Sequence, residues 1–107
     1  MTTESNVAII IVNFNGDTLL TACVRSVLAS TYPVTVYIID NASQDKSIHY
    51  LQQAIADNNG VHIIKNPRNL GFAAATNLVL SQLKHEYYLL LNPDCFIQAD
   101  TIAQFIH

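Results

Sequence analysis

Charged residues are scarce in this sequence. Lys and Arg together number 5, Asp and Glu number 8, and the formal net charge is −3 with histidine neutral. So few cations argue against nucleic acid or an acidic membrane surface as the main partner, because both are bound through clustered Lys and Arg. An anionic ligand would need backbone N–H groups, helix N-termini or a metal ion to hold it. No apolar run approaches the roughly 20 residues that cross a bilayer, so we expect no transmembrane segment.

Glycine and cysteine are also rare, with 3 and 2 residues. Neither a Gly-x-Gly-x-x-Gly run nor a P-loop signature is present, which argues against dinucleotide-binding and P-loop proteins. A Gly-x-Ser-x-Gly nucleophile elbow is absent as well. Cys23 and Cys95 lack zinc-site spacing and lie in apolar surroundings, so we expect reduced core thiols in a cytosolic protein. The first six residues contain no cation, so no signal peptide is expected.

Half of the 107 residues are hydrophobic, which is enough for one globular domain over residues 1–107. Four apolar runs predict buried strands, at 7–12, 34–39, 61–64 and 87–91. The last of these has no alternation, which is typical of a strand that is buried on both faces. Helical periodicity follows each run, and we expect Asn15 or Asp17 to cap the first helix and Asp100 to cap the last.

This alternation predicts a three-layer α/β/α fold with a Rossmann-like parallel sheet and right-handed crossovers. The expected strand order is 3-2-1-4, with the switch point between the first and fourth strands. Three strands then end at the same rim in a polar residue, namely Asn13, Asp40 and Asp94. Open α/β sheets bind ligands at this rim, although each polar cluster is also ordinary turn chemistry. We therefore predict a ligand site there, with Arg68, Asn69 and Gly71 after the third strand.

Four motifs in order resemble the family-2 glycosyltransferases of the GT-A fold, in particular their rhamnosyltransferase-like branch. They are VAIIIVNFNG at 7–16, IIDNASQDKS at 38–47, NLGFAAATN at 69–77 and LNPD at 91–94. The resemblance implies the nucleotide-binding half of a GT-A fold. It also implies an inverting transfer of a sugar from a UDP- or dTDP-sugar to a saccharide or lipid-linked acceptor, as in polysaccharide biosynthesis.

The resemblance also implies residue roles. Asp40 would accept a hydrogen bond from the base or ribose, and Gly71 would allow close backbone approach to the phosphates. Asp94 matches the last acid of the family's Asp-x-Asp motif and would hold Mg²⁺ or Mn²⁺ against the diphosphate. Asn92 replaces the first acid, which leaves metal dependence open. The implied nucleotide-binding residues are Asn13, Phe14, Asn15, Asp40, Asn41, Arg68, Asn69, Gly71, Phe72 and Asn92.

The family's catalytic base lies in a later segment, and nothing in residues 95–107 matches it. We therefore expect a truncated portion of a longer glycosyltransferase, with no catalytic residue within this chain. The full-length protein is expected to be cytoplasmic, either free or peripheral at the inner face of the membrane. Self-association through the open edge of the fourth strand is also expected. Two other interpretations stay open: a non-catalytic nucleotide-sugar-binding or regulatory module, and a sugar-phosphate nucleotidyltransferase. The last would normally carry a glycine-rich, basic loop after the first strand.

Overall fold

The computed structural model describes residues 6–56, 58 and 60–106. The segment before Asn6, for which no signal peptide is expected, and the end of the last helix at His107 lie outside the described residues. Strands and helices alternate in the expected order. They are β1 (Val7–Asn13), α1 (Asp17–Leu28), β2 (Thr35–Asn41), α2 (Ser47–Ile55), β3 (Val61–Asn66), α3 (Phe72–Leu80), β4 (Tyr87–Leu91) and α4 (Thr101–Ile106).

The four strands form one parallel sheet in the order β3-β2-β1-β4. This confirms the predicted order and places the switch point between β1 and β4. The register aligns Asn13 with Asp40 and aligns Asn41 with Asn66. β1, β2 and β3 extend past their apolar runs and end at Asn13, Asn41 and Asn66. Backbone pairing between these strands continues beyond the last apolar side chain.

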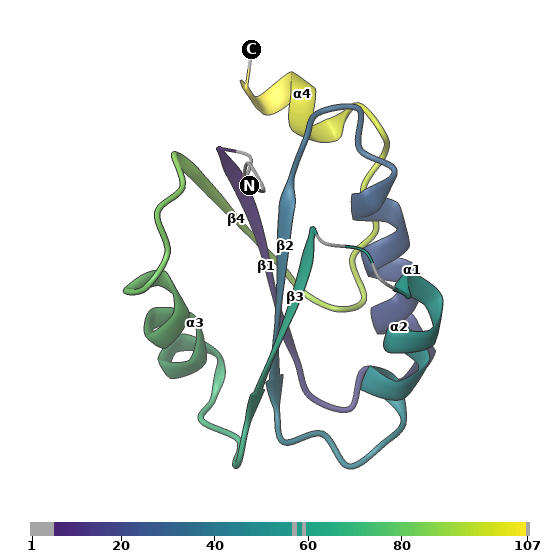
Figure 1. Ribbon diagram of the computed structural model, residues 1–107, viewed down its shortest axis with the longest axis vertical. Coiled ribbons are helices and arrows are strands. Elements are labelled where there is room, and N and C mark those ends of the chain that lie inside the picture. Colours follow the sequence, from purple (N-terminus) through teal and green to yellow (C-terminus); the bar gives the residue numbers. More distant parts are fainter. Residues whose placement is uncertain (1–5, 57, 59, 107) are drawn as a thin grey trace.

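Helices cover both faces of the sheet, as predicted (Figure 1). α1 and α2 lie on one face, α3 lies on the other, and α4 lies beyond the amino ends of the strands. None of the helices within the described residues has both the length and the apolar character of a membrane span.

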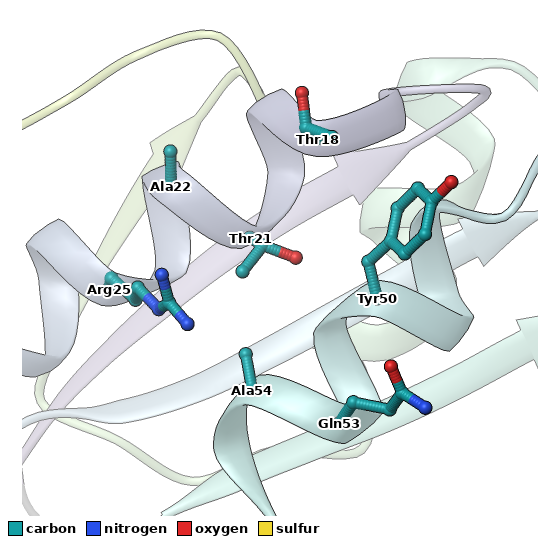
Figure 2. Close-up of a pocket in the computed structure, with 7 residues that line it drawn as sticks. All are labelled: Thr18, Thr21, Ala22, Arg25, Tyr50, Gln53 and Ala54. Carbon is teal, nitrogen blue, oxygen red and sulfur yellow. The ribbon is translucent and has the colours of Figure 1, made fainter.

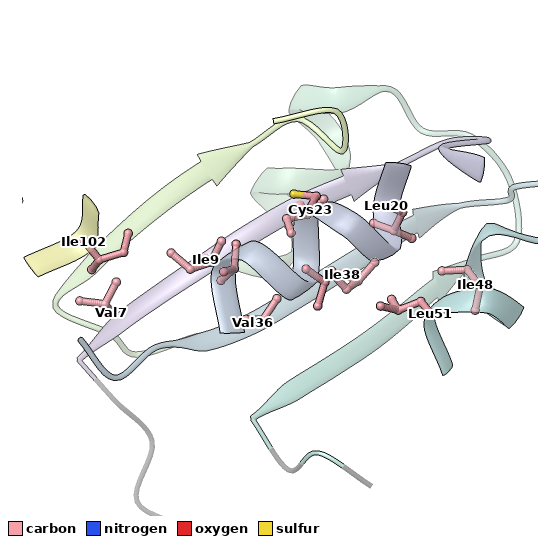
Figure 3. Packing of buried hydrophobic residues seen from close by; sticks show 12 residues of the cluster. Val7, Ile9, Leu20, Cys23, Val36, Ile38, Ile48, Leu51 and Ile102 are labelled. Carbon is pink, nitrogen blue, oxygen red and sulfur yellow. The ribbon is translucent and has the colours of Figure 1, made fainter. Parts of the chain in front are cut away.

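The larger apolar cluster fills the space between the sheet and α1 and α2 (Figure 3). Ile9 and Ile38 point from the sheet toward Leu20 of α1 and Leu51 of α2, and all four are fully buried. Each such side chain contributes about 1.5–3 kcal/mol relative to an exposed one. On the opposite face, Ile10, Tyr37 and Ile39 pack against Ala75 and Val79 of α3.

β4 is less buried than its apolar sequence predicts. Tyr87 is 50% exposed and Leu90 is 39% exposed, so the expectation of burial on both faces is wrong for the described structure. The reason is its position at the edge of the sheet, beside β1 alone. α3 packs mainly on β1 and β2, which leaves Leu90 only partly covered.

The segment after β4 returns along α1 toward the amino end of the sheet. The Ile97 N–H donates to Ser26 Oγ at 3.2 Å, and the Thr31 N–H donates to the Ala99 carbonyl at 2.7 Å. These bonds fix the course of the loop that carries Asp94. Asp100 directly precedes α4, and its carboxylate accepts a bond from the Gln104 side chain, while its role as the cap of this helix stays a prediction.

Candidate functional site

Asn13 occupies the centre of a polar network at the carboxyl end of the sheet, and its side chain is fully buried. Its Nδ2 lies 3.0 Å from Asp40 Oδ1, 3.1 Å from Ser43 Oγ and 2.9 Å from Ser47 Oγ. Because an amide carries two N–H hydrogens, these three acceptors share them. Asn13 Oδ1 in turn accepts the Gly16 N–H at 3.2 Å. One side chain therefore joins the ends of β1 and β2 to the loops before α1 and α2.

Asp40 holds the loop that follows its own strand. It is 5% exposed, and it accepts the Ser43 hydroxyl at 2.6 Å and the Ser43 N–H at 3.2 Å. It does not cap α2, because that helix begins only at Ser47. The Asp40 Oδ2 atom accepts only the Ser43 N–H among these bonds, so it retains lone-pair capacity for a ligand donor.

Asn15 and Asp17 do not cap α1, contrary to expectation, since Gly16 precedes the helix with no side-chain cap. Asn15 Oδ1 instead accepts the N–H groups of Gln44 and Asp45. Asp45 in turn accepts the Asp17 N–H at 2.9 Å. These bonds tie the loop after β1 to the loop after β2.

The Asp45 carboxylate also accepts the hydroxyl and N–H of Ser47 at the start of α2. Desolvation acts to raise the pKa of Asp45, but the hydrogen bonds from Ser47 and from the Asp17 backbone outweigh it and lower the pKa. The two tied loops hold strained backbone: Asn15, Asp17 and Ala42 have φ of 53°, 51° and 61°. Non-glycine residues adopt such angles at a cost that the surrounding contacts must offset.

A second network joins β2, β3 and the loop before α3. Asn66 Nδ2 donates to Asn41 Oδ1 at 2.9 Å, and Asn41 Nδ2 donates to the Gly71 carbonyl at 3.2 Å. The Gly71 N–H donates to Asn69 Oδ1 at 2.8 Å. Gly71 has φ 79° and ψ 169°, a region that is essentially restricted to glycine. The loop thereby brings its backbone to the same rim as Asp40.

The loops after β1 and β4 touch at Gly16. A Cβ at this position would lie 3.4 Å from Pro93 Cβ and would collide with Asn13 Oδ1. Asn92 and Asp94 flank this contact and are exposed. The contact at Asp94 Oδ1 is with Cys95 Sγ, at the long distance of 4.0 Å. The Asp94 carboxylate is therefore accessible at the rim, beside the switch point.

The two cysteines differ in their surroundings. Cys23 is fully buried against the sheet, as predicted for a core thiol, and both cysteines are free. Burial, together with nearby Cys95 and Asp94, raises the pKa of Cys23 from 9.0 to about 11. Cys95 is only partly buried, because it belongs to the surface loop after β4, so it is not the core thiol that the sequence predicts.

The structure thus brings most of the predicted residues to one rim. Asn13, Asp40 and Asn41 are buried, and their side chains bond the neighbouring strands and loops. Phe14 and Phe72, by contrast, are 51% and 49% exposed. Arg68 is exposed on the loop after β3, which lies at the opposite edge of the sheet from β4. The sequence interpretation missed the four residues that complete the two networks. They are Ser43, Asp45, Ser47 and Asn66.

The rim suits a hard cation only in part. Among the residues that the structure describes, no three His, Cys, Asp or Glu side chains gather as metal ligands. Asp94 offers an accessible carboxylate and Asn92 offers an amide oxygen, and oxygen ligands of this kind suit Mg²⁺ and Mn²⁺. The remaining ligands would have to come from a bound diphosphate and water. The donor set therefore fits a cation only when a bound anion and water complete its ligands.

A separate groove of about 590 Å³ runs between α1 and α2 on their outer face (Figure 2). Thr21 Oγ1 is buried there and has no hydrogen-bond partner within the described ranges. None of the predicted site residues lines this groove. Its lining residues are Thr18, Thr21, Ala22, Arg25, Tyr50, Gln53 and Ala54.

Comparison with known sequences gives a consistent result. The model of the family described as Glycosyl transferase family 2 matches residues 8–107. An uncharacterized glycosyltransferase of Haemophilus influenzae is 31% identical over 99 residues, which cover 92% of this chain and 40% of that protein. A teichoic acid poly(glycerol phosphate) polymerase of Staphylococcus epidermidis is 26% identical over 92 residues, or 84% of this chain and 13% of that protein. The chain thus spans well under half the length of these relatives.

Solved structures share the fold. A mannosyltransferase from Pyrobaculum calidifontis, in complex with GDP-Man and Mn²⁺, superimposes with a TM-score of 0.86 at 20% identity, over 98% of this chain and 32% of that one. S. aureus TarS in complex with UDP-GlcNAc gives a TM-score of 0.83 at 18% identity, over 94% of this chain and 30% of that one. The sheet order, the covering helices and the family match over residues 8–107 together show that this chain belongs to glycosyl transferase family 2 and has the Rossmann-like part of the GT-A fold.

Proposed function

We propose that this chain supplies the donor-nucleotide site of an inverting glycosyltransferase. The enzyme would transfer a sugar from a UDP- or dTDP-sugar to a saccharide or lipid-linked acceptor. The observation that carries the proposal is the Asn13–Asp40 network at the carboxyl rim, next to the β1–β4 switch point. Open α/β sheets bind their ligands at such points, and membership of glycosyl transferase family 2 supports a sugar nucleotide as the ligand.

In this proposal the nucleoside lies against the loops after β1 and β2. Asp40 Oδ2 accepts a donor from the base or ribose, while Oδ1 stays bound to Asn13 and Ser43. Phe14 and Phe72 expose aromatic surface at the rim, and such faces suit stacking against a base. Asn15 and Asn41 position this surface through their bonds to the neighbouring loops.

The diphosphate would lie across the carboxyl rim, between the residues before α3 and the loop after β4. Arg68 supplies one positive charge, and Asn69 and Gly71 supply backbone at close range. Asp94, with Asn92 beside it, would hold Mg²⁺ or Mn²⁺. A bound cation offsets the charge that develops on the departing diphosphate. One arginine cannot neutralise a diphosphate by itself, so the cation strengthens donor binding without being its only source.

Titration calorimetry with UDP separates these roles. Asp40→Asn keeps the size of the side chain but removes its charge, so UDP binding weakens both with Mn²⁺ and with chelator. Asp94→Asn removes only the increment that Mn²⁺ adds. Asp100→Asn is the matched control, because Asp100 is exposed and lies before α4 at the other end of the sheet, and its titrations stay unchanged. Equal losses for Asp40→Asn and Asp94→Asn under both conditions would show that the roles are wrongly assigned.

We further propose that the acceptor site and the catalytic base belong to a longer polypeptide. The relatives, of which this chain spans 40% or less, support this. Without a positioned base, transfer loses about 10²–10⁴-fold in rate, so residues 1–107 alone bind donor but do not transfer sugar. Labelled sugar nucleotide, Mn²⁺ and a panel of saccharide acceptors test this. Sustained transfer by residues 1–107 would reveal a base within them.

A non-catalytic nucleotide-sugar-binding module is the second candidate, and Asn92 in place of the first acid favours it. The two candidates predict different behaviour for a polypeptide extended to the length of the relatives. An enzyme transfers sugar in the assay above, and its rate falls on Asp94→Asn substitution. A binding module binds the sugar nucleotide but transfers nothing in either form.

Two further expectations concern partners and location. β4 presents an open edge with Tyr87 and Leu90 half-exposed, so we propose that the chain by itself self-associates. The location of the whole polypeptide, cytoplasmic and peripheral at the inner face of the membrane, stays a prediction. Fractionation of cells that express the whole polypeptide tests this location.

A further inference from the structure

The loop after β4 is held against α1 at two points on either side of Cys95. At the first point, Cys23 Sγ lies 3.7 Å from the Asn92 carbonyl oxygen. At the second, the Ile97 N–H donates to Ser26 Oγ at 3.2 Å. Cys23 and Ser26 are one turn apart on α1, so Cys95 lies in the short span that faces this turn.

The two cysteines also share one acceptor. The Asn92 carbonyl oxygen accepts the Cys95 N–H at 3.0 Å and is the same atom that Cys23 Sγ contacts. The chain therefore turns back at Asn92–Cys95 directly above the buried thiol. Both cysteines are free, and they are the two cysteines of the whole sequence.

We propose that Cys23 and Cys95, which are both reduced in this structure, form a disulfide under oxidising conditions and thereby tie the Asp94 loop covalently to α1. The oxidant is a small-molecule disulfide such as oxidised glutathione. Cys95 is the more accessible sulfur, so its thiolate attacks the oxidant first and releases one glutathione thiolate. The Cys23 sulfur, after its proton passes to solvent, then attacks the Cys95 sulfur of the mixed disulfide and expels the second glutathione. Two protein thiols are oxidised and one glutathione disulfide is reduced.

The bond would act on the rim through Asp94, which is adjacent to Cys95. A disulfide requires the two Cα atoms to lie about 4.4–6.8 Å apart, so Cys95 and its neighbours become fixed relative to α1. This consequence rests on the proposed function, in which Asp94 holds the cation. Oxidation then lowers the increment that Mn²⁺ adds to UDP binding and leaves the metal-independent part unchanged.

The bond itself is tested by peptide mapping of the folded, dilute chain after incubation with oxidised glutathione. Trypsin cuts after Arg25 and Lys84, so the two cysteines fall in separate peptides, 1–25 and 85–107. We expect these two peptides to be joined in the non-reduced digest, and we expect neither cysteine to react with a thiol reagent. Dithiothreitol restores both. A chain that keeps both thiols, that carries only glutathione on Cys95, or that forms only links between chains would overturn the proposal.

Two variants keep the test independent of folding defects. Cys95→Ser changes only a partly buried loop residue, and it leaves the buried Cys23 unmodified. Cys23→Ala removes the resolving thiol, so the mixed disulfide accumulates on Cys95. The same glutathione adduct at equal levels in wild type would refute a resolving role for Cys23.

UDP titrations of the oxidised and reduced chain test the consequence separately. A joined peptide pair with an unchanged Mn²⁺ increment would refute the effect on the rim. Failure of the reduced chain to bind UDP at all would refute the proposed function, while the joined peptides would still establish the disulfide.

Discussion

The Asn13 network makes the stability of this fold depend strongly on one amide side chain. In Asn13→Ala, Asp40, Ser43 and Ser47 lose a shared donor, and the Gly16 N–H loses its acceptor. Net contributions are about 0.5–1.5 kcal/mol per neutral hydrogen bond and about 1.5–3 kcal/mol for a bond to a charged group. Two shared hydrogens, one of them serving a buried carboxylate, therefore indicate a loss of about 2–4 kcal/mol in the free energy of unfolding. Rearrangement of the serine hydroxyls sets the lower end of this range.

Urea denaturation followed by circular dichroism measures this loss. Asn77→Ala is the matched control, because Asn77 is an exposed residue within α3. That substitution should be neutral or slightly stabilising, since alanine is the better helix former. A loss below about 1 kcal/mol for Asn13→Ala, or equal losses for the two variants, would refute the view that Asn13 holds the rim together. The expected loss of about 2–4 kcal/mol corresponds to a melting temperature of Asn13→Ala that is lower by roughly 10–25 °C.

Three other predictions concern backbone strain, pH and the open edge. Gly71→Ala should cost about 1–3 kcal/mol, although a Cβ there meets nothing within 4 Å. Gly60→Ala, without a positive φ, should cost less in the same urea assay, and equal costs would contradict a backbone origin. Because burial raises the pKa of Cys23 from 9.0 to about 11, the folded state holds this proton more tightly than the unfolded state. Stability should therefore fall between about pH 9 and 11, and Cys23→Val should flatten this fall in urea titrations across that range. Leu90→Lys should reduce self-association in sedimentation velocity with little loss of stability, since Leu90 is 39% exposed, and unchanged association would point away from β4.

The fold could be predicted from the periodicity of apolar residues and from the polar residues that follow the strands. The apolar runs near β1 and β2 are rich in β-branched residues and are separated by helical patterns, so a parallel sheet with covering helices was the consistent solution. The 3-2-1-4 order followed because the third crossover must reverse direction to bring Asp94 near Asp40. The presence of Asn13, Asp40 and Asp94 at one rim was therefore predictable from the sequence.

Only the tertiary structure decided what these residues contact. Asn13 faces Asp40 because β1 and β2 pair with these two residues in register, and local sequence does not encode register across 27 positions. For the same reason, Asn15 bonds the loop before α2 rather than its own helix, and Asn66 reaches Asn41. The exposure of Leu90 depends on where α3 packs, and the course of the Cys95 loop along α1 depends on the bonds of Ser26 and Thr31 to the returning chain. Apolar sequence establishes that a strand has two faces to bury, but the neighbouring elements alone determine whether both faces are covered.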